Sequence, residues 1–460
     1  MGKNRILKIQ MLALLLFGSI AIFFIYYTSS QRLLSYTNKE EIKIIDGLIK
    51  IITSRTALIT DFLKVGGIRA AFLNAFLIFL FNFSLIKLLK IRITGIVIAS
   101  FFTVFGFSFF GKNIFNIIPF YIGGILYSYY DHLEFKDIFI SISFASALAP
   151  FVSEVAFTVK TENISYLNPY INAIILGVFI GFIVTPVARK MANFHEGFNL
   201  YNLGFTGGIL GAVVTSVLRL YDFNVPGNNN LSSEYDFILR VICLSFFISL
   251  ILLGFYINGM SLKGYKGLIK NSGLKADYIK KFGYGPTSIN MGINGLIATL
   301  FVYVVGGTLN GPFLAGILTV VGFSAYGKHF RNIIPILIGV YIAKFGNSTP
   351  TFTVILSGLF GTALAPVAGV YGPLWGIIAG WLHLGVVQTI GVVHGGLNLY
   401  NNGFSAGIVA GFLLPIMEFI TTHKEKTRQY YLKRRKKLYE ELSKRISKNS
   451  DSENNLHDDY

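Results

Sequence analysis

The chain contains a single cysteine, Cys243, among its 460 residues. One thiol cannot form an intramolecular disulfide and cannot build a Cys-based metal site. The seven histidines show no metal-ligand spacing with cysteine or with carboxylates, so we expect no metal. No glycine-rich phosphate loop and no Ser-His-Asp arrangement is present either. We therefore expect no cofactor and no enzymatic activity.

Charged residues are also scarce. They make up 13% of the chain, against 53% hydrophobic residues, and the mean hydropathy is +0.60. A soluble chain carries roughly twice that share of charge. Apolar runs recur along nearly the whole length, many close to the ~20 residues that cross a bilayer core. The composition predicts an all-α polytopic membrane protein.

The charge that is present has mostly one sign, with a formal net charge of +18. Eleven of the 40 Lys and Arg residues lie between Lys424 and Lys448, and most others lie in short loops between apolar runs. Basic residues in those places orient a membrane protein. We expect the lipid bilayer, and no nucleic acid, as a partner.

A sequence repeat dominates what remains. Thr103–Pro119 matches Thr319–Pro335 at 11 of 17 positions, with an offset of 216 residues. His195–Ile209 matches His394–Ile408 at 10 of 15 positions, with an offset of 199. One half of the chain is therefore a diverged copy of the other. In membrane proteins this pattern is typical of transport pathways built between two repeats.

The apolar runs predict seven spans in each repeat. Because seven is odd, the two copies enter the membrane from opposite sides, as inverted-topology repeats do. We place the first repeat at 1–220, the second at 221–420, and a basic, then acidic, partly disordered cytoplasmic tail at 421–460. The run at 11–27 counts as a retained span, because 237–257 is its counterpart. The other expected spans are 70–86, 93–110, 114–130, 137–153, 169–188, 198–218, 287–306, 311–326, 332–346, 351–366, 371–391 and 398–420.

The fifth span of each repeat is short, since it ends at Ala149-Pro150 or at Ala365-Pro366. We expect the carbonyl groups freed at these ends to face a cavity between the repeats, because lipid cannot bind them. Each short span could instead form a re-entrant hairpin with the sixth. That alternative reduces the count from 14 crossings to 12.

Loop charge predicts that both termini are cytoplasmic. With this orientation, 28 Lys and Arg residues lie inside and 12 outside. The turn at Lys112 then faces the outside of the cell, and the turn at Lys328 faces the inside.

Polar residues that recur in both repeats are the main candidates for a solute pathway, because charge at membrane depth is costly and usually functional. A Gly-Lys turn opens the fourth span of each repeat, and a lysine beside a helix N-terminus attracts anions. The alternative is a lysine that reaches along the turn to the surface. This set comprises Lys112, Lys328, Asn116 and Asn332, with Asn74 and Asn290 near the start of the second spans, where interhelical bonding is the alternative.

The Asn-Leu-Tyr-Asn motif adds hydrogen-bonding groups at the seventh span of each repeat. Its asparagines lie three apart on one helical face, where they either line a path or cap the helix and bond a neighbour. The motif residues are Asn199, Tyr201 and Asn202 in the first repeat, and Asn398, Tyr400 and Asn401 in the second.

Four residues are candidates for proton or ion coupling, with a purely structural role as the alternative for each. His195 and His394 precede the Asn-Leu-Tyr-Asn motifs, and histidine titrates near neutral pH. Glu154 and His383 lie in or near the spans without a counterpart in the other repeat.

Together, the duplicated Gly-Phe-Ser…Gly-Lys…Asn-Ile-Ile-Pro and His-x-Gly-x-Asn-Leu-Tyr-Asn-x-Gly-Phe elements resemble an uncharacterised two-repeat family of bacterial polytopic membrane proteins, domain of unknown function 1576. The resemblance covers most of residues 60–420. It implies a location and an architecture but no substrate. The seven-plus-seven count is also similar to that of nucleobase and sulfate carriers, by topology alone.

These features favour transport of a small polar or anionic solute by a secondary transporter or channel in a bacterial inner membrane. One alternative is a membrane-embedded enzyme acting on a lipid-linked substrate, and another is a non-transporting scaffold. Duplication of the polar residues favours transport, because a duplicated enzyme normally loses one copy of its site. The sequence leaves open the solute, the coupling ion, channel or carrier, and whether the protein forms a homo-oligomer.

Overall fold

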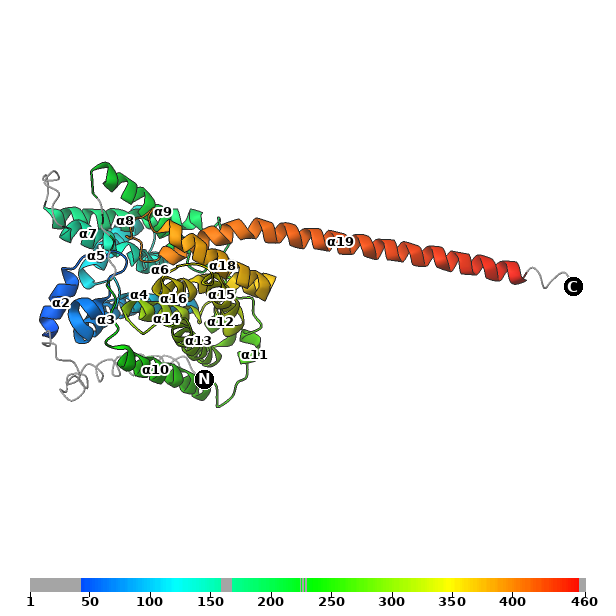
Figure 1. Ribbon diagram of the computed structural model, residues 1–460, viewed down its shortest axis with the longest axis horizontal. Helices are drawn as coiled ribbons and strands as arrows, with labels where there is room; N and C mark the ends of the chain where they lie inside the picture. Colours follow the sequence, from blue (N-terminus) through cyan, green and yellow to red (C-terminus); the bar gives the residue numbers. More distant parts are fainter. Residues whose placement is uncertain (1–42, 159–167, 224, 226, 228–229, 455–460) are drawn as a thin grey trace. The chain divides into compact units, whose positions relative to one another are not determined.

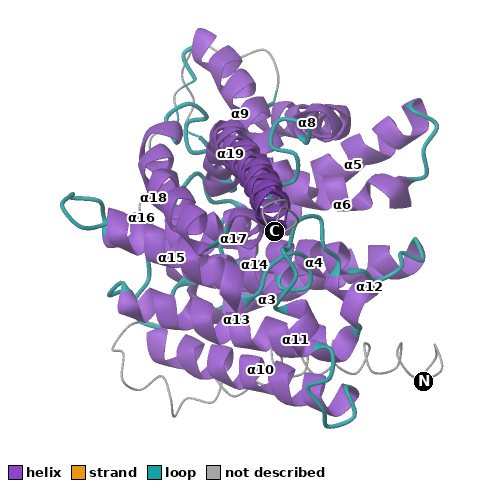
Figure 2. Ribbon diagram, turned by 90° about the vertical axis from the view of Figure 1, so that its right-hand side faces the viewer, coloured by secondary structure: helices purple, strands orange, loops and turns teal. Residues whose placement is uncertain are grey.

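The computed structural model describes residues 43–158, 168–223, 225, 227 and 230–454, and within them the fold is entirely helical (Figure 2). The expected first span, 11–27, lies outside the described residues. Figure 1 labels the elements. The first repeat comprises α2 (Ile44–Ile52), α3 (Phe62–Leu88), α4 (Gly95–Phe107), α5 (Ile114–Tyr130), α6 (Phe135–Ala145), the 3-10 turn η1 (Ser146–Leu148), α7 (Ala149–Phe157), α8 (Pro169–Met191) and α9 (Asn202–Leu220).

The second repeat follows the same order of helices. It comprises α10 (Asp236–Ile257), α11 (Tyr265–Leu268), α12 (Tyr278–Phe282), α13 (Tyr284–Val304), α14 (Gly311–Phe323), α15 (Phe330–Ala343), α16 (Thr351–Gly361), η2 (Thr362–Leu364), α17 (Ala365–Tyr371), α18 (Pro373–Ile390) and α19 (Asn401–Asn454). Each predicted span from residue 70 onward thus coincides with a helix.

The chain divides into two compact units, Met1–Ala410 and Gly411–Tyr460. The described part of the second unit is the continuation of α19, which carries the basic tail in helical form. The geometry below belongs to the first unit.

Apolar helices make this a polytopic membrane protein. Nine helices in the described part of the chain are long and apolar enough to cross a bilayer. They also expose large apolar side chains, as α10 does with Phe237, Leu252 and Tyr256. Such surface is stable in lipid and costly in water. The helices α4, α14 and α15 are apolar but shorter, with 13, 13 and 14 residues.

Equivalent glycines give both repeats the same backbone bends. Gly67 interrupts α3 with a φ of 80°, and Gly283 separates α12 from α13 with a φ of 82°. Gly111 and Gly327 have φ values of 85° and 91° in the turns before α5 and α15. Residues with a side chain rarely adopt these angles. The duplicated sequence therefore folds as a duplicated structure, and the two-repeat prediction is confirmed.

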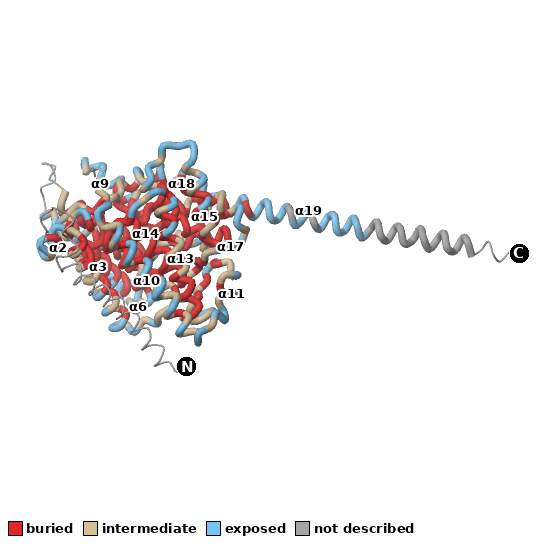
Figure 3. The backbone as a smooth tube through the Cα atoms, turned by 60° about the horizontal axis from the view of Figure 1, so that its bottom comes forward, coloured by how far each residue is buried: buried red, intermediate tan, exposed pale blue. Residues whose placement is uncertain are grey.

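The helices α4 and α14 pack against each other in the middle of the first unit (Figures 1 and 2). The start of α4 meets the end of α14, because a Cβ on Gly95 would lie 2.2 Å from the carbonyl oxygen of Ala325. At the other end, a Cβ on Gly311 would lie 2.4 Å from the carbonyl oxygen of Phe109. These equivalent helices are thus antiparallel, which is the relation expected of inverted repeats. All residues of α14 are buried, and Figure 3 shows buried chain around it.

The expectation for the fifth span was wrong. Neither helix ends at its proline: residues 135–157 and 351–371 form helices of 23 and 21 residues, each with one 3-10 turn inside. Pro150 and Pro366 stand in the first turn after that break, where a missing N–H costs nothing. Both helices are long enough to cross a bilayer, so the 12-crossing hairpin alternative loses its basis.

Candidate functional site

Each Asn-Leu-Tyr-Asn motif reaches across to the other repeat. The backbone N–H of Leu200 donates to the carbonyl of Ala363 in η2, and that of Leu399 donates to the carbonyl of Ala147 in η1, both over 3.0 Å. The 3-10 turns leave these carbonyls without helical partners. A backbone of the opposite repeat, rather than a water-filled cavity, therefore satisfies them.

The first asparagine of each motif shapes this crossing segment. Asn199 Oδ1 accepts a hydrogen bond from the backbone N–H of Tyr201 over 2.9 Å, and Asn398 Oδ1 accepts one from Tyr400 over 3.0 Å. An asparagine bonding two residues ahead forms an Asx turn. The turn directs each tyrosine into the opposite repeat.

Each of these tyrosines meets the lysine of the other repeat. Lys112 Nζ donates to the hydroxyl of Tyr400 over 2.8 Å and to Ser146 Oγ over 2.9 Å. Lys328 Nζ donates to the hydroxyl of Tyr201 and, over 2.7 Å, to Thr362 Oγ1. We call these two clusters the crossed lysine–tyrosine pairs. Each pair joins a side chain of one repeat to a side chain of the other.

Both lysines are completely buried. The Nζ atoms lie 4.8 Å and 4.4 Å from the ring centroids of Tyr400 and Tyr201, within the range of a cation–π contact. No described carboxylate forms an ion pair with Lys112 or Lys328. The expectation that these lysines face water on opposite sides was wrong, because their turns fold inward. Each lysine is thus held by hydroxyl groups and an aromatic ring, without a described carboxylate beside it.

Four of the predicted asparagines hold the lysine turns. Asn74 Nδ2 donates to the carbonyls of Ser108 and Lys112, over 2.7 Å and 2.9 Å. Asn116 Nδ2 donates to the carbonyl of Gly111 in the same turn, over 3.0 Å. In the second repeat, Asn290 and Asn332 make the equivalent bonds to the turn of Lys328. These amides fix the lysine backbone and do not line the cavity described next.

A cavity of about 670 Å³ lies between the repeats. Equivalent residues from both repeats line it. The cavity is also lined by other residues between 192 and 204, by Lys275 and by Tyr326. The paired wall residues are Thr103 and Thr319, Phe107 and Phe323, Phe144 and Phe360, Tyr201 and Tyr400, and Gly204 and Gly403.

The equivalent face of the other repeat is joined by a backbone hydrogen bond. There the backbone N–H of Leu58 donates to the carbonyl of Gly396 over 3.0 Å. The matching atoms on the cavity side belong to Leu274 and Gly197, two described residues between which no backbone hydrogen bond forms. The side chain of Lys275 lies against Gly197 instead. The two faces therefore differ in this backbone hydrogen bond.

The two motif histidines are fully hydrogen-bonded. His195 Nε2 lies 3.1 Å from Asn202 Oδ1, and His394 Nε2 lies 2.8 Å from Asn401 Oδ1. The amide of Asn202 donates to the carbonyl of Ala188, so its oxygen faces the histidine, and Nε2 is assigned as the donor. Burial lowers the pKa of both histidines, which favours the neutral ring. His195 and Asn202 also line the cavity.

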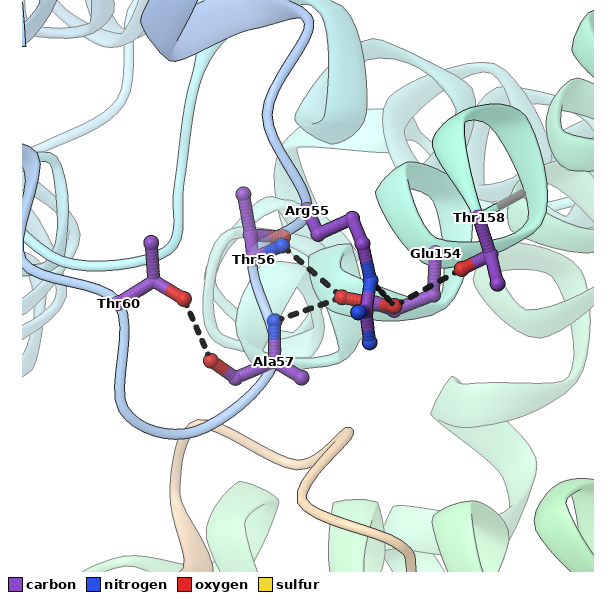
Figure 4. Close-up of polar contacts among 6 residues, drawn as sticks. All are labelled: Arg55, Thr56, Ala57, Thr60, Glu154 and Thr158. Carbon is purple, nitrogen blue, oxygen red and sulfur yellow. Dashed lines mark hydrogen bonds and ion pairs between the residues drawn. The ribbon is translucent and has the colours of Figure 1, made fainter. Parts of the chain in front are cut away.

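Glu154 lies away from the cavity and fastens the segment before α3 (Figure 4). Its buried carboxylate accepts hydrogen bonds from the backbone N–H groups of Thr56 and Ala57, both over 3.0 Å. It also accepts from Arg55 Nε over 2.8 Å and from the hydroxyl of Thr158 over 3.0 Å. The carboxylate thus holds the chain directly before Leu58.

His383, the last coupling candidate, bonds Asn402 Oδ1 over 3.2 Å and does not line the cavity.

Five of the sixteen predicted residues line the cavity: His195, Asn199, Tyr201, Asn202 and Tyr400. Ser146 and Thr362 were missed, although hydroxyl residues at equivalent positions were a detectable signal. Four phenylalanines of the wall were also missed, although each is identical to its counterpart in the other repeat: Phe107 and Phe323, and Phe144 and Phe360. Among the described residues, no three His, Cys, Asp or Glu side chains are placed to hold a metal ion.

Comparison with known proteins agrees with the two-repeat architecture. Residues 40–220 and 257–419 match a family described as "Protein of unknown function (DUF1576)". The two stretches cover one repeat each. No match was found among curated proteins or among solved structures.

Proposed function

The chain belongs to this family of unknown function, and we propose that it transports a small anionic solute across a membrane by alternating access. The observation that carries the proposal is the set of crossed lysine–tyrosine pairs beside a cavity between the repeats. The proposed location is a bacterial cytoplasmic membrane, with both termini in the cytoplasm.

Charge is the first support for an anion. A buried ammonium group without a carboxylate loses its hydration and gains only the hydroxyl and ring contacts in return. An anion entering the cavity would compensate Lys112 and Lys328, whose tyrosine partners line the wall. A cation would instead disfavour the ammonium form of both lysines. The electrostatics therefore favour a negatively charged solute.

The crossed arrangement is the second support. Because each lysine and its tyrosine belong to different repeats, any motion of one repeat against the other changes both pairs together. The same motion changes the cavity wall, which consists of equivalent residues from both repeats. Solute binding and repeat motion are thereby coupled through the same side chains, as alternating access requires.

The unequal faces are the third support. The Leu58–Gly396 hydrogen bond closes one face, and its counterpart on the cavity side is missing. In an inverted repeat, exchanging these two conditions produces a second state of similar structure that opens to the opposite side. The present state would then be one of two.

Uptake by reconstituted protein tests the proposal. Proteoliposomes loaded with chloride, sulfate, acetate or benzoate are diluted into the same labelled anion, and exchange is measured. We expect exchange of at least one anion above that of empty liposomes. Lys112→Gln should lower its rate about ten-fold or more, because the charged hydrogen-bond donor is lost.

Lys266→Gln is the matched control, since Lys266 is exposed and distant from the lysine turns in sequence. It should leave exchange unchanged. Absence of exchange for every anion, or an equal effect of Lys112→Gln and Lys266→Gln, contradicts the proposal.

A further inference from the structure

We propose that the solute is an amphipathic organic anion, a carboxylate on an aromatic or branched aliphatic body, whose charged end binds at the hydroxyl groups of the crossed lysine–tyrosine pairs. The inference rests on the proposed function and names the chemical class of its solute. It follows from the wall of the cavity and from the donors at its inner end.

Six aromatic rings form a continuous belt on the cavity wall, three from each repeat. Neighbouring ring centroids along the belt lie 4.6–6.5 Å apart. Equivalent contacts recur: the ring of Phe107 packs on that of Tyr400 as the ring of Phe323 packs on that of Tyr201. The six rings are Phe107, Phe144, Tyr201, Phe323, Phe360 and Tyr400.

A belt of this kind does not suit a small inorganic anion. Sulfate or chloride must exchange its hydration shell for hydrogen-bond donors, and phenyl rings supply none. An aromatic or branched aliphatic body gains by contact with the same rings. The volume of about 670 Å³ lies within the range of pockets for organic molecules. The wall therefore selects the body of the solute.

The tyrosine hydroxyls determine which charged group of the solute can bind. Lys112 donates a proton to the oxygen of Tyr400, so that hydroxyl must direct its own proton elsewhere. No acceptor for this proton is found among the residues that the structure describes. Donation from an ammonium group also strengthens the phenol as a donor. Tyr400 is thus prepared to donate to a carboxylate, and Lys112 acts through it as a positioning residue.

The entrance does not account for the selectivity. Lys275 and Glu196 both line the cavity, and their charges are of opposite sign. Lys112 and Lys328 do not line it, and each acts on the cavity through the tyrosine that it bonds. The solute therefore enters with its carboxylate leading toward the tyrosines and its apolar body among the rings.

Binding measurements on the purified full chain in detergent test the chemical class. The probes are benzoate, hexanoate, the neutral analogue benzyl alcohol, sulfate and chloride, titrated calorimetrically. We expect saturable binding of benzoate or hexanoate, and no binding of benzyl alcohol, sulfate or chloride. Tyr400→Phe should weaken carboxylate binding about ten-fold or more, because one hydrogen bond to a charged group is lost.

Tyr170→Phe is the matched control, because Tyr170 is exposed on α8 and loses the same single oxygen. It should bind benzoate like the unaltered protein. Phe144→Ala should weaken benzoate binding while leaving the elution profile on size exclusion unchanged. Equal affinity of the Tyr400→Phe and unaltered proteins overturns the assigned site.

The two proposals can fail separately. If sulfate or chloride is exchanged by proteoliposomes and no carboxylate binds, transport stands and the amphipathic class is overturned. If benzoate binds in a Tyr400-dependent manner and no exchange occurs, the ligand class stands and transport is overturned. Absence of binding for both carboxylates overturns the class whatever else is observed.

Discussion

The segments that lead into the second span differ between the repeats, whereas the lysine turns that follow are nearly the same. In the first repeat, Glu154 binds the backbone of Thr56 and Ala57, and Leu58 is tied to Gly396. In the second repeat, the position of Glu154 holds Val370. That segment lacks a carboxylate: Gly273 N donates to Asn271 Oδ1, and the carbonyl of Asn271 lies 2.7 Å from His329 Nε2.

The lysine turns show the opposite behaviour. Their asparagine clamps, their glycine angles and their hydroxyl partners recur, with Ser146 replaced by Thr362. The two repeats are therefore alike at the lysine turns and different in the segments around Leu58 and Leu274. Equivalent lysine turns would serve both conformations of a transporter equally, whereas the unequal segments would favour one conformation over the other.

We expect the largest effect from replacing both lysines of the crossed lysine–tyrosine pairs. The double variant Lys112→Gln/Lys328→Gln should reduce anion exchange to the level of empty liposomes. If the centre is symmetric, each single variant should lose about ten-fold, and the two losses should agree within about two-fold. A loss confined to one lysine would show that the pairs are not equivalent.

The asymmetric face is tested by Glu154→Gln. The amide loses the ion pair with Arg55, which is 32% exposed, and weakens two charge-assisted hydrogen bonds. We expect amide hydrogen exchange in residues 53–60 to accelerate about ten-fold or more. Residues 269–276 provide the internal control and should be unchanged, since no such carboxylate holds them. Equal acceleration of amide exchange in both segments would show that Glu154 does not hold residues 53–60 specifically.

The symmetric crossing of α9 and α19 is tested by two glycines. A Cβ on Gly204 would lie 2.9 Å from the Cα of Gly403, and the reverse distance is also 2.9 Å. Gly204→Ala and Gly403→Ala should each cost about 1–3 kcal/mol, measured as a fall in Tm. Gly385→Ala is the control, because nothing lies within 4 Å of its added Cβ. A fall in Tm for only one of the two variants would show that the two glycines do not occupy equivalent positions in the helix crossing.

The smallest effect is expected from the histidines. Burial lowers the pKa of His195 and His394, so the folded protein binds fewer protons than the unfolded chain below the ordinary histidine pKa. Stability is then complete well above pH 6.5 and falls as the pH drops below it. His195→Gln and His394→Gln should each reduce the drop in Tm between pH 8 and pH 5.5. A drop that both variants retain in full would assign the pH dependence to other groups.

Much of the architecture was predictable because it depends on local composition and on identity between the repeats. Long apolar runs must form helices in lipid, and glycines at positive φ recur wherever the chain bends in both repeats. Lys112, Tyr201 and their counterparts were identifiable as polar residues duplicated in an apolar chain. Their pairing was not, since crossing between repeats depends on contacts separated by 288 and 127 residues.

The fifth span shows the limit of local signals. Proline at 150 and 366 predicted a helix end, yet each helix continues past it. The opposite repeat supplies the N–H groups of Leu399 and Leu200 to the carbonyls freed at the break. Only a partner distant in sequence could decide that outcome.

The sequence by itself therefore determined the helices, the two repeats and the set of recurring polar residues, because hydrophobic length and duplication are properties of the linear chain. The tertiary structure alone decided that the lysines turn inward, that each meets the tyrosine of the other repeat, and that Glu154 holds the backbone of Thr56 and Ala57. The physical reason is that burial and hydrogen-bond pairing are properties of segments brought together in space.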